Sequence, residues 1–161
     1  MKRQEFDSKL TSLFAQRGFI CKKKTYYKEI SNEVTIVFGL QKSSYGEYYY
    51  LEYGFCFGSI NQNMPYPKLC QINLNCGRIM TSIGKAIEYE KLPEGFMDEL
   101  EQHLDEIITE MKYLVNLGKD EFIGYFLSGK GNQSWFILGA ETADYFGLSM
   151  ETFKYHIVLS P

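Results

Sequence analysis

After one short helical stretch, the first half of the chain alternates apolar and polar positions with the two-residue period of β-strands. Residues 3–16 carry apolar side chains at helical spacing, and Gly18 follows as a C-terminal cap. The alternation then predicts four strands, at residues 19–30, 34–41, 47–57 and 70–76. The connections between them are short, so an antiparallel meander is the simplest topology.

The second half of the chain has the longer period of amphipathic helices. Between Pro93 and Gly118, apolar residues recur every three or four positions, which predicts one long helix with an apolar stripe. Leu104 lies in the middle of this stripe, so we expect it to be buried and Glu106, two residues on, to face solvent. The sheet residues expected opposite Leu104 are Tyr53, Phe55, Ile72 and Leu74.

Shorter elements are predicted at residues 120–127, 135–146 and 150–157. No repeat, linker or low-complexity segment interrupts the pattern, so residues 1–161 are predicted to form a single domain. The predicted fold class is α+β. A four-stranded antiparallel sheet carries helices packed on one face, as a two-layer sandwich.

Composition and charge narrow the class of protein. The 161 residues include 17 basic and 20 acidic side chains, a net charge of −3, and 45% of residues are apolar, as in globular domains. Residues 1–80 carry a net charge of +5 and residues 81–161 one of −8. The overall acidity argues against general nucleic-acid binding, which depends on neutralising phosphates, although it allows a local basic patch. No apolar stretch approaches the ~20 residues of a membrane helix.

The cysteines and the N-terminus indicate a cytoplasmic protein. Cys21, Cys56, Cys70 and Cys76 form no CxxC pair. The last two share one predicted strand and would lie ~20 Å apart, too far for a disulfide. We therefore expect reduced, mostly buried thiols. The chain starts with two basic residues but no apolar run behind them, so it does not resemble a secretory signal.

Two aromatic-rich motifs in roughly the first sixty residues resemble those of a known family. The first combines Gly18-Phe19, Lys22-Lys23-Lys24 and Thr25-Tyr26-Tyr27-Lys28. The second combines Gln41-Lys42-Ser43 and Tyr49-Tyr50-Leu51-Glu52-Tyr53-Gly54. Both are similar to signatures of a bacterial family described as domain of unknown function 4304. The resemblance implies a small bacterial cytoplasmic α+β domain, and it implies no activity, cofactor or catalytic residue.

Candidate catalytic and metal-binding residues are few. Glu99, His103, Glu106 and Glu110 share one flank of the long helix, a spacing that can present carboxylates and an imidazole to a metal. An ordinary solvated acidic face explains the same spacing, and we favour that explanation. Residues 128–132 superficially resemble a phosphate loop but lack its spacing and its preceding apolar strand. We predict no catalytic residue, metal or cofactor.

The most informative group of residues is the polar face expected on the open side of the sheet. Phenol, amide and ammonium groups alternate there with core positions, and such groups provide the contacts of binding surfaces. The candidate binding residues are Lys24, Tyr26, Gln41, Tyr48, Tyr50, Asn73 and Asn75, with Lys22, Lys28, Thr35, Glu52 and Gln71 beside them. A solvated sheet face, or one covered by the C-terminal segment from Trp135 onward, explains the same pattern.

These features suggest three functions. The leading hypothesis is a non-enzymatic module that binds another protein, of an immunity or regulatory type. The alternative is a small-ligand-binding or enzymatic pocket between the sheet and the helices, where Arg78 pairs with an anionic ligand. The third is the binding of single-stranded nucleic acid to the Lys- and Tyr-rich face. The overall acidic charge of the chain disfavours this function. The sequence leaves the oligomeric state open.

Overall fold

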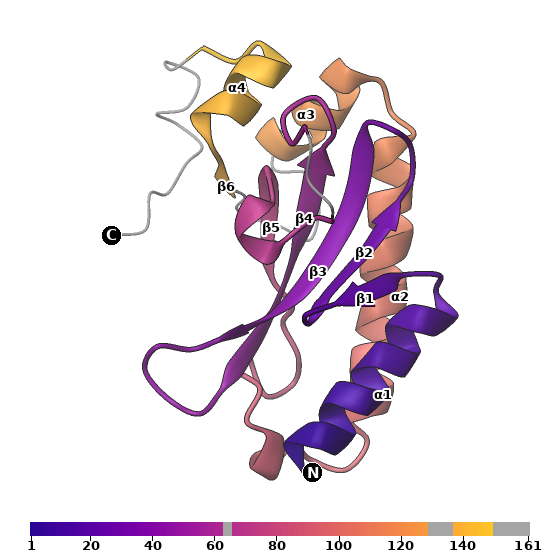
Figure 1. Cartoon of the computed structure of the whole chain (residues 1–161), viewed down its shortest axis with the longest axis vertical. Coiled ribbons are helices and arrows are strands. Elements are labelled where there is room, and N and C mark those ends of the chain that lie inside the picture. Colours follow the sequence, from indigo (N-terminus) through magenta and orange to yellow (C-terminus); the bar gives the residue numbers. More distant parts are fainter. Residues whose placement is uncertain (63–65, 129–136, 150–161) are drawn as a thin grey trace.

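The computed structural model describes residues 1–62, 66–128 and 137–149 and has an α+β fold (Figure 1). Its helices are α1 (Arg3–Gln16), α2 (Phe96–Val115), α3 (Lys119–Leu127) and α4 (Ala140–Phe146), with 3₁₀ turns η1 (Leu69–Gln71) and η2 (Tyr89–Lys91). Its strands are β1 (Ile20–Lys22), β2 (Thr25–Glu29), β3 (Val34–Lys42), β4 (Tyr49–Phe57), β5 (Leu74–Arg78) and β6 (Ile137–Leu138). The strands form an antiparallel sheet in chain order, and α1 and α2 lie on one face of it.

The four predicted strands become five, β1 to β5, with the two-residue β6 at the edge beside β5. Where the pattern predicts one strand over residues 19–30, the chain forms a hairpin with Lys22 opposite Thr25. Lys23 and Lys24 make its two-residue turn, both in the left-handed region at φ 49° and 64°. Such turns match the twist of the strands but usually select asparagine or glycine. Because both residues of this turn are lysines, the sequence carries no sign of a hairpin here.

The last predicted strand, residues 70–76, is displaced along the chain. Residues Leu69–Gln71 form η1, and the strand itself runs from Leu74 to Arg78. The amide side chain of Asn73 accepts a hydrogen bond from the backbone of Phe57 instead of pointing to solvent. This bond joins residues 16 apart in the chain and depends on how β4 folds back, so alternation alone gave the wrong bounds.

The end of α1 turns the chain back onto the sheet, as the cap predicted at Gly18 requires. Gly18 lies in the left-handed region at φ 75°. Its amide donates to the carbonyl of Ala15 (2.9 Å), and the amide of Phe19 donates to that of Phe14 (3.0 Å). The Phe14 and Phe19 rings, 5.4 Å apart at their centroids, add the apolar contact of a Schellman cap.

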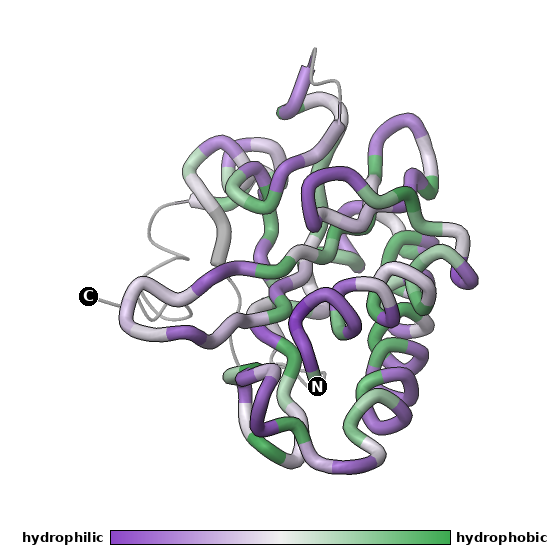
Figure 2. Tube along the Cα trace, turned by 60° about the horizontal axis from the view of Figure 1, so that its bottom comes forward, coloured by the Kyte–Doolittle hydropathy of each residue, from purple (hydrophilic) through white to green (hydrophobic). Residues whose placement is uncertain are grey.

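The main core lies between the sheet and the two long helices. From α2 it takes six buried residues of the predicted stripe, and the other two predicted members, Ile107 and Val115, are partly buried against it. The six are Phe96, Leu100, Leu104, Ile108, Met111 and Leu114. Leu104 is fully buried and Glu106 is exposed, as predicted. Figure 2 shows the apolar positions of the long helices interleaved with hydrophilic ones. Tyr53, Phe55 and Leu74 face this core, but Ile72 does not, because it packs on the opposite side of the sheet.

The shorter helices agree with the sequence pattern where they are described. The helix predicted at residues 120–127 is α3, and α4 ends at Phe146 with Gly147 as its C-terminal cap at φ 68°. The element predicted at residues 150–157 lies outside the described residues. None of the helices in the described ranges has the length and apolarity needed to span a bilayer.

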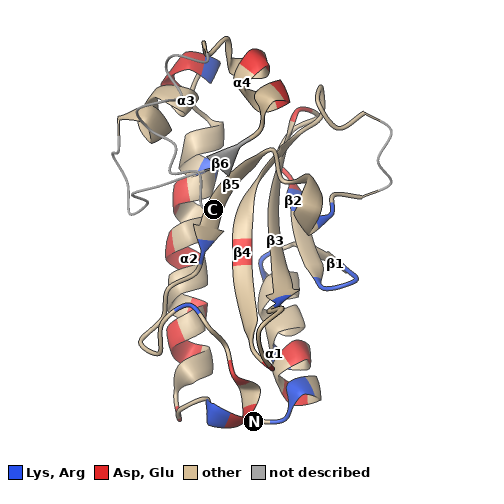
Figure 3. Cartoon of the chain, turned by 90° about the vertical axis from the view of Figure 1, so that its left-hand side faces the viewer, with Lys and Arg blue, Asp and Glu red and all other residues tan. Residues whose placement is uncertain are grey.

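Arg17 joins the oppositely charged halves of the chain. Its guanidinium, at the end of α1, donates to Asp105 (2.6 and 2.7 Å) and to Glu101 (3.0 Å), both on α2. The hydrogen bond from Arg17 lowers the pKa of Asp105, and the pKa of Arg17 is raised in return. Figure 3 shows the acidic residues along α2 and the basic residues of the β1–β2 turn. The charge asymmetry of the sequence is thus partly neutralised between the two helices.

The outer face of the sheet, which is turned away from α1 and α2, is partly covered by the chain between β4 and β5. A small apolar cluster forms there from Tyr27, Val37, Cys56, Tyr66 and Ile72. About half of the segment from Trp135 onward, which the sequence suggested as a cover, lies outside the described residues. Its described part forms β6 and α4.

Two strand glycines allow this cover to approach the sheet closely. A Cβ atom on Gly39 would lie 2.9 Å from Cδ1 of Leu69 in η1. A Cβ atom on Gly54 would lie 2.5 Å from Cγ2 of Ile72 in this covering chain and only 2.2 Å from the carbonyl oxygen of Leu74 at the start of β5. A glycine inside a strand often marks such an approach of another backbone, and here it defines where the outer face is closed.

Candidate functional site

The predicted binding residues separate into two groups in the structure. Those that meet on the outer face are Gln41, Tyr48, Tyr50 and Arg78. Those that bond to other parts of the fold are Lys24, Tyr26, Asn73 and Asn75. Only the first group forms a surface on which a partner has access to several of the predicted residues together.

Arg78 is the centre of the first group. Its guanidinium carbon lies 3.6 Å from the centroid of the Tyr50 ring, a cation–π contact. Its Nε donates to Oε1 of Glu52 at 2.9 Å, and its Nη2 donates to Oε1 of Gln41 at 3.1 Å. The Tyr48 ring meets the Tyr50 ring edge-on, with centroids 5.6 Å apart. These five residues are the Arg78 cluster.

Strand register brings the cluster together from three strands. Gln41 of β3 lies opposite Tyr50 of β4, and Glu52 of β4 lies opposite Arg78 of β5. Side chains two residues apart on a strand share a face, so Tyr50 and Glu52 sit side by side on the outer face. Arg78 was predicted as a possible anion-binding residue, but no sequence pattern pairs it with Glu52, 26 residues earlier.

A β-bulge in β5 adjusts the direction of Arg78. The pairing with β4 shifts between Tyr53 and Gly54, and Gly77, just before Arg78, has φ 100°. The amide of Gly77 donates to Oδ1 of Asn75 at 2.6 Å. Bulges often redirect a side chain near a functional site. Asn75 therefore uses its side-chain oxygen to support the bulge that positions Arg78.

The Arg78 cluster continues into the exposed tip of the β3–β4 hairpin, which projects from the body of the fold (Figure 1). Tyr45, at the tip, is 93% exposed, and Met80, two residues after Arg78, is 54% exposed. Tyr, Met and Arg are the residue types enriched at protein interfaces. The Arg78 cluster together with Tyr45 and Met80 is the tyrosine–arginine patch.

Tyr26 is not on the outer face, and the prediction for it was wrong. It is 1% exposed, and its ring stacks on Phe14 of α1 with centroids 4.2 Å apart. Its hydroxyl shares a hydrogen bond of 3.3 Å with Thr11, and burial raises the pKa of the phenol to about 12. The unpredicted β1–β2 turn sets the phase of β2, which directs Tyr26 to the helices and Tyr27 outward.

Two of the lysines expected on the outer face also point toward α1. Nζ of Lys24 donates to Oδ2 of Asp7 at 2.9 Å, and Nζ of Lys28 donates to the carbonyl of Arg17 at 2.8 Å. Lys22 is exposed, and its ammonium lies 5.3 Å from the centroid of the Tyr66 ring. The outer face is therefore less basic than the sequence suggested.

Asn73 has a structural role at the far end of β4. Its Oδ1 accepts hydrogen bonds from the amide of Phe57 (2.8 Å) and from the side-chain amide of Asn61. Its carbonyl accepts a hydrogen bond from the hydroxyl of Thr142 in α4 (3.0 Å). These bonds hold α4 and the chain after β4 against the sheet, and they occupy the side-chain oxygen predicted to contact a partner.

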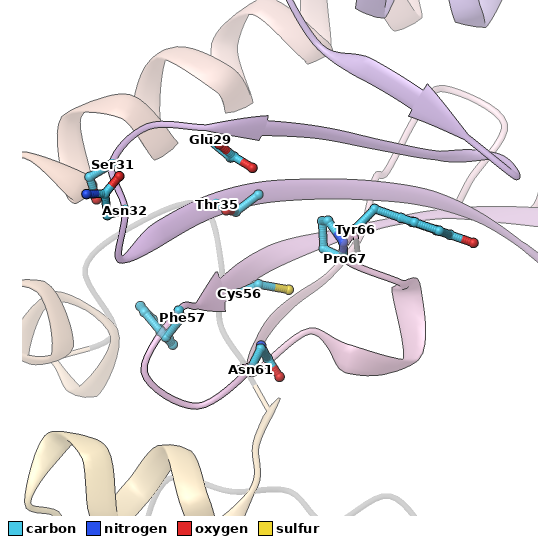
Figure 4. Close-up of a pocket in the computed structure, with 10 residues that line it drawn as sticks. Glu29, Ser31, Asn32, Thr35, Cys56, Phe57, Asn61, Tyr66 and Pro67 are labelled. Atoms are coloured by element: carbon cyan, nitrogen blue, oxygen red, sulfur yellow. The ribbon is translucent and has the colours of Figure 1, made fainter. Parts of the chain in front are cut away.

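A pocket of about 280 Å³, which the sequence analysis did not predict, opens on the outer face (Figure 4). One wall comes from β2, β3 and the turn between them, with the side chains of Glu29, Ser31, Asn32 and Thr35. The other wall comes from β4 and the chain after it, and consists of Cys56, Phe57, Gly58, Asn61, Tyr66 and Pro67. The lining residues come from separate segments, so no single motif marks the pocket.

Short contacts close one end of this pocket. The amide of Gly58 donates to the carbonyl of Glu33 at 2.7 Å, and the hydroxyl of Ser59 donates to the Glu33 carboxylate at 2.7 Å. A Cβ atom on Gly58 would lie 2.5 Å from the carbonyl oxygen of Asn32. Glycine at this position lets the two walls meet at this end of the pocket.

The helix flank considered for a metal has other partners. Glu99 accepts hydrogen bonds from the amide (2.5 Å) and the hydroxyl (2.7 Å) of Ser82, and these lower its pKa. Glu110 accepts a hydrogen bond from the hydroxyl of Tyr125. Within the described part of the chain, no group of three or more His, Cys, Asp and Glu side chains could hold a metal ion.

The thiols divide evenly between the interior and the surface. Cys56 and Cys76 are buried, whereas Cys21 and Cys70 are exposed, and none of the four is in a disulfide. Burial raises the pKa of the Cys56 thiol to about 12 and raises that of Cys76 as well. Both buried thiols therefore stay protonated near neutral pH and are poor nucleophiles.

Comparison with known proteins identifies a family for most of this fold. The family model described as a domain of unknown function (DUF4304) matches residues 10–115. The match runs from α1 through α2 and contains β1 to β5, so it extends well beyond the two motifs found in the sequence. No curated protein and no solved structure gives a significant match to the chain.

Proposed function

The chain belongs to the DUF4304 family, and we propose that it is a non-enzymatic module that binds another protein through the tyrosine–arginine patch. A regulatory or immunity-type role is the kind of function that suits such a module. The family description carries no activity, so the proposal depends on the chemistry of the patch itself.

The observation that carries the proposal is the fixed Arg78–Tyr50 pair at the surface. The Arg78 side chain is 34% exposed, while its cation–π contact and its hydrogen bonds to Glu52 and Gln41 hold it in place. A side chain that is already ordered loses little conformational entropy when a partner covers it. Arg and Tyr are also among the residues that contribute most to binding energy at interfaces.

The same contacts favour a protein over an anionic ligand or a nucleic acid. An anion at Arg78 would compete with the Glu52 carboxylate, whose side chain is only 12% exposed. A nucleic acid would need free ammonium groups beside the aromatic rings, but Lys24 and Lys28 bond toward α1. A protein surface uses neutral aromatic contacts and hydrogen bonds, which the patch provides.

Site-specific photo-crosslinking tests the proposal. p-Benzoylphenylalanine replaces Tyr45 in one variant and Tyr113 in a matched control, because Tyr113 is also well exposed (60%) but lies on α2. Both variants are expressed and irradiated in cells of the organism that encodes the chain. We expect the Tyr45 variant to form a discrete crosslinked product that the Tyr113 variant does not form.

Competition then assigns the crosslink to the patch. An excess of the unmodified chain should abolish the product in lysate, whereas the double variant Tyr50→Ala, Arg78→Ala should not. Circular dichroism confirms that the double variant is folded. Identical products from positions 45 and 113, or full competition by the double variant, would refute recognition through the patch.

A further inference from the structure

We infer that the pocket of Figure 4 binds a primary alkylammonium group, carried either by a free amine or by a lysine side chain. This site is separate from the tyrosine–arginine patch. Its test therefore does not depend on whether the patch binds a protein.

The charge of the pocket selects a cation. Among the described residues that line it, Glu29 is the one acidic side chain, and no lysine or arginine is present. The other lining side chains are hydroxyl, amide, thiol and apolar groups. Lys22 contacts the Tyr66 ring but is not part of the lining. A negative site without a compensating cation attracts a positive group and repels carboxylates and phosphates.

The polar wall offers acceptors that the fold leaves unused. Glu29 at the end of β2 lies directly opposite Thr35 at the start of β3, and both side chains lie on the pocket side (Figure 4). Within the described ranges, neither of these two side chains has a hydrogen bond to another residue. The Glu29 carboxylate and the Thr35 hydroxyl, at directly paired strand positions, can each accept an N–H group of one ammonium ion.

The opposite wall suits the aliphatic stem of such a ligand. Cys56, Tyr66 and Pro67 contribute apolar surface, and the Cys56 thiol is already used in a hydrogen bond to the carbonyl of Gln71. A lysine or alkylamine stem packs on apolar groups while its charged end seeks polar ones. The volume of about 280 Å³ is close to the lower end for ligand pockets, which favours one slender chain over a bulky ring system.

Titration followed by amide NMR of the full chain tests this inference. The probes are pentylamine, 1,5-diaminopentane and Nα-acetyl-lysine methylamide, with 1-pentanol as the neutral control of similar shape. We expect saturable shifts of the Glu29, Thr35 and Cys56 amides with the amines, with affinity at least roughly tenfold higher than for the alcohol. Tighter binding of the lysine derivative would indicate a protein side chain as the natural ligand, and tighter binding of the diamine a free amine.

Matched variants locate the charge that matters. Glu29→Gln keeps the shape of the side chain and should weaken pentylamine binding by about tenfold, to the level of the alcohol. Thr35→Val should weaken it by several-fold, because it removes one acceptor. Glu94→Gln changes another exposed carboxylate outside the pocket and should have no effect. Equal binding of amine and alcohol, shifts outside the pocket, or equal effects of Glu29→Gln and Glu94→Gln would overturn the inference.

Discussion

Leu104→Ala is a direct test of how α2 packs on the sheet. Leu104 lies in the middle of the apolar stripe, is fully buried, and belongs to the same core as Phe55 and Leu74. The substitution removes buried methyl groups and leaves a cavity, which together cost ~2–5 kcal/mol. That is a large part of the ~5–15 kcal/mol that stabilises a domain. With a typical m-value of ~2 kcal/mol/M, the urea midpoint should fall by ~1–2.5 M.

Glu106→Ala is the matched control for this measurement. It also places alanine inside α2. Because Leu and Glu have similar helix propensities, the gain in helix propensity on substitution by alanine is nearly the same in both variants. Glu106 is exposed and accepts one hydrogen bond, from Gln102 at 3.0 Å, so its loss should cost less than ~1 kcal/mol. Urea unfolding of both variants is followed by circular dichroism. Equal midpoint shifts would refute the assignment of the buried face of α2.

Two further predictions concern a close backbone approach and an ion pair. Gly54→Ala should cost several kcal/mol or prevent folding, because its Cβ would lie 2.2 Å from the Leu74 carbonyl oxygen. Gly124→Ala in α3 is the control: its Cβ would meet nothing within 4 Å, so this substitution should stabilise the fold by ~0.5–1 kcal/mol. Thermal unfolding compares the two, and a loss of stability in both would count against the steric argument. Asp105→Asn should cost at most ~1 kcal/mol at pH 7, because Asp105 is 58% exposed. Since Arg17 lowers the pKa of Asp105 in the folded chain, this contribution is present above the ordinary value of 3.8 and is lost as pH falls through the lowered pKa. Wild type and variant should therefore converge in acid, and a difference that persists at pH 2 would contradict the ion-pair explanation.

The helices and the α1 cap were predictable because their signals are local. The stripe of α2 repeats over five turns of helix, and a glycine stands at the one position after α1 that needs a left-handed conformation. The β1–β2 turn was not predicted because it has no local signal in the sequence. Lys23 and Lys24 adopt a conformation that favours other residue types, so nothing local distinguished a hairpin from one long strand.

The candidate site was less predictable because it depends on strand register. Assigning Tyr26 to the outer face required the phase of β2, and the missed turn gave the opposite phase. Joining Arg78 to Glu52 required the pairing of β4 with β5 and its bulge, neither of which has a local signature. One available signal was overlooked. Gly39 and Gly54 inside strands indicate that another segment approaches the sheet there.

These two glycines also explain why the outer face carries two separate candidate sites. The chain between β4 and β5 packs over the middle of the sheet at Gly39 and Gly54, which leaves the ends of β3 open. Gln41 lies at the end that carries the Arg78 cluster, and Thr35 lies at the end that carries the pocket. At ~3.3 Å per strand residue, the two positions are ~20 Å apart. Sites at that distance without shared partners respond independently to substitution, so crosslinking at the patch and amine binding in the pocket probe two different properties of one sheet face.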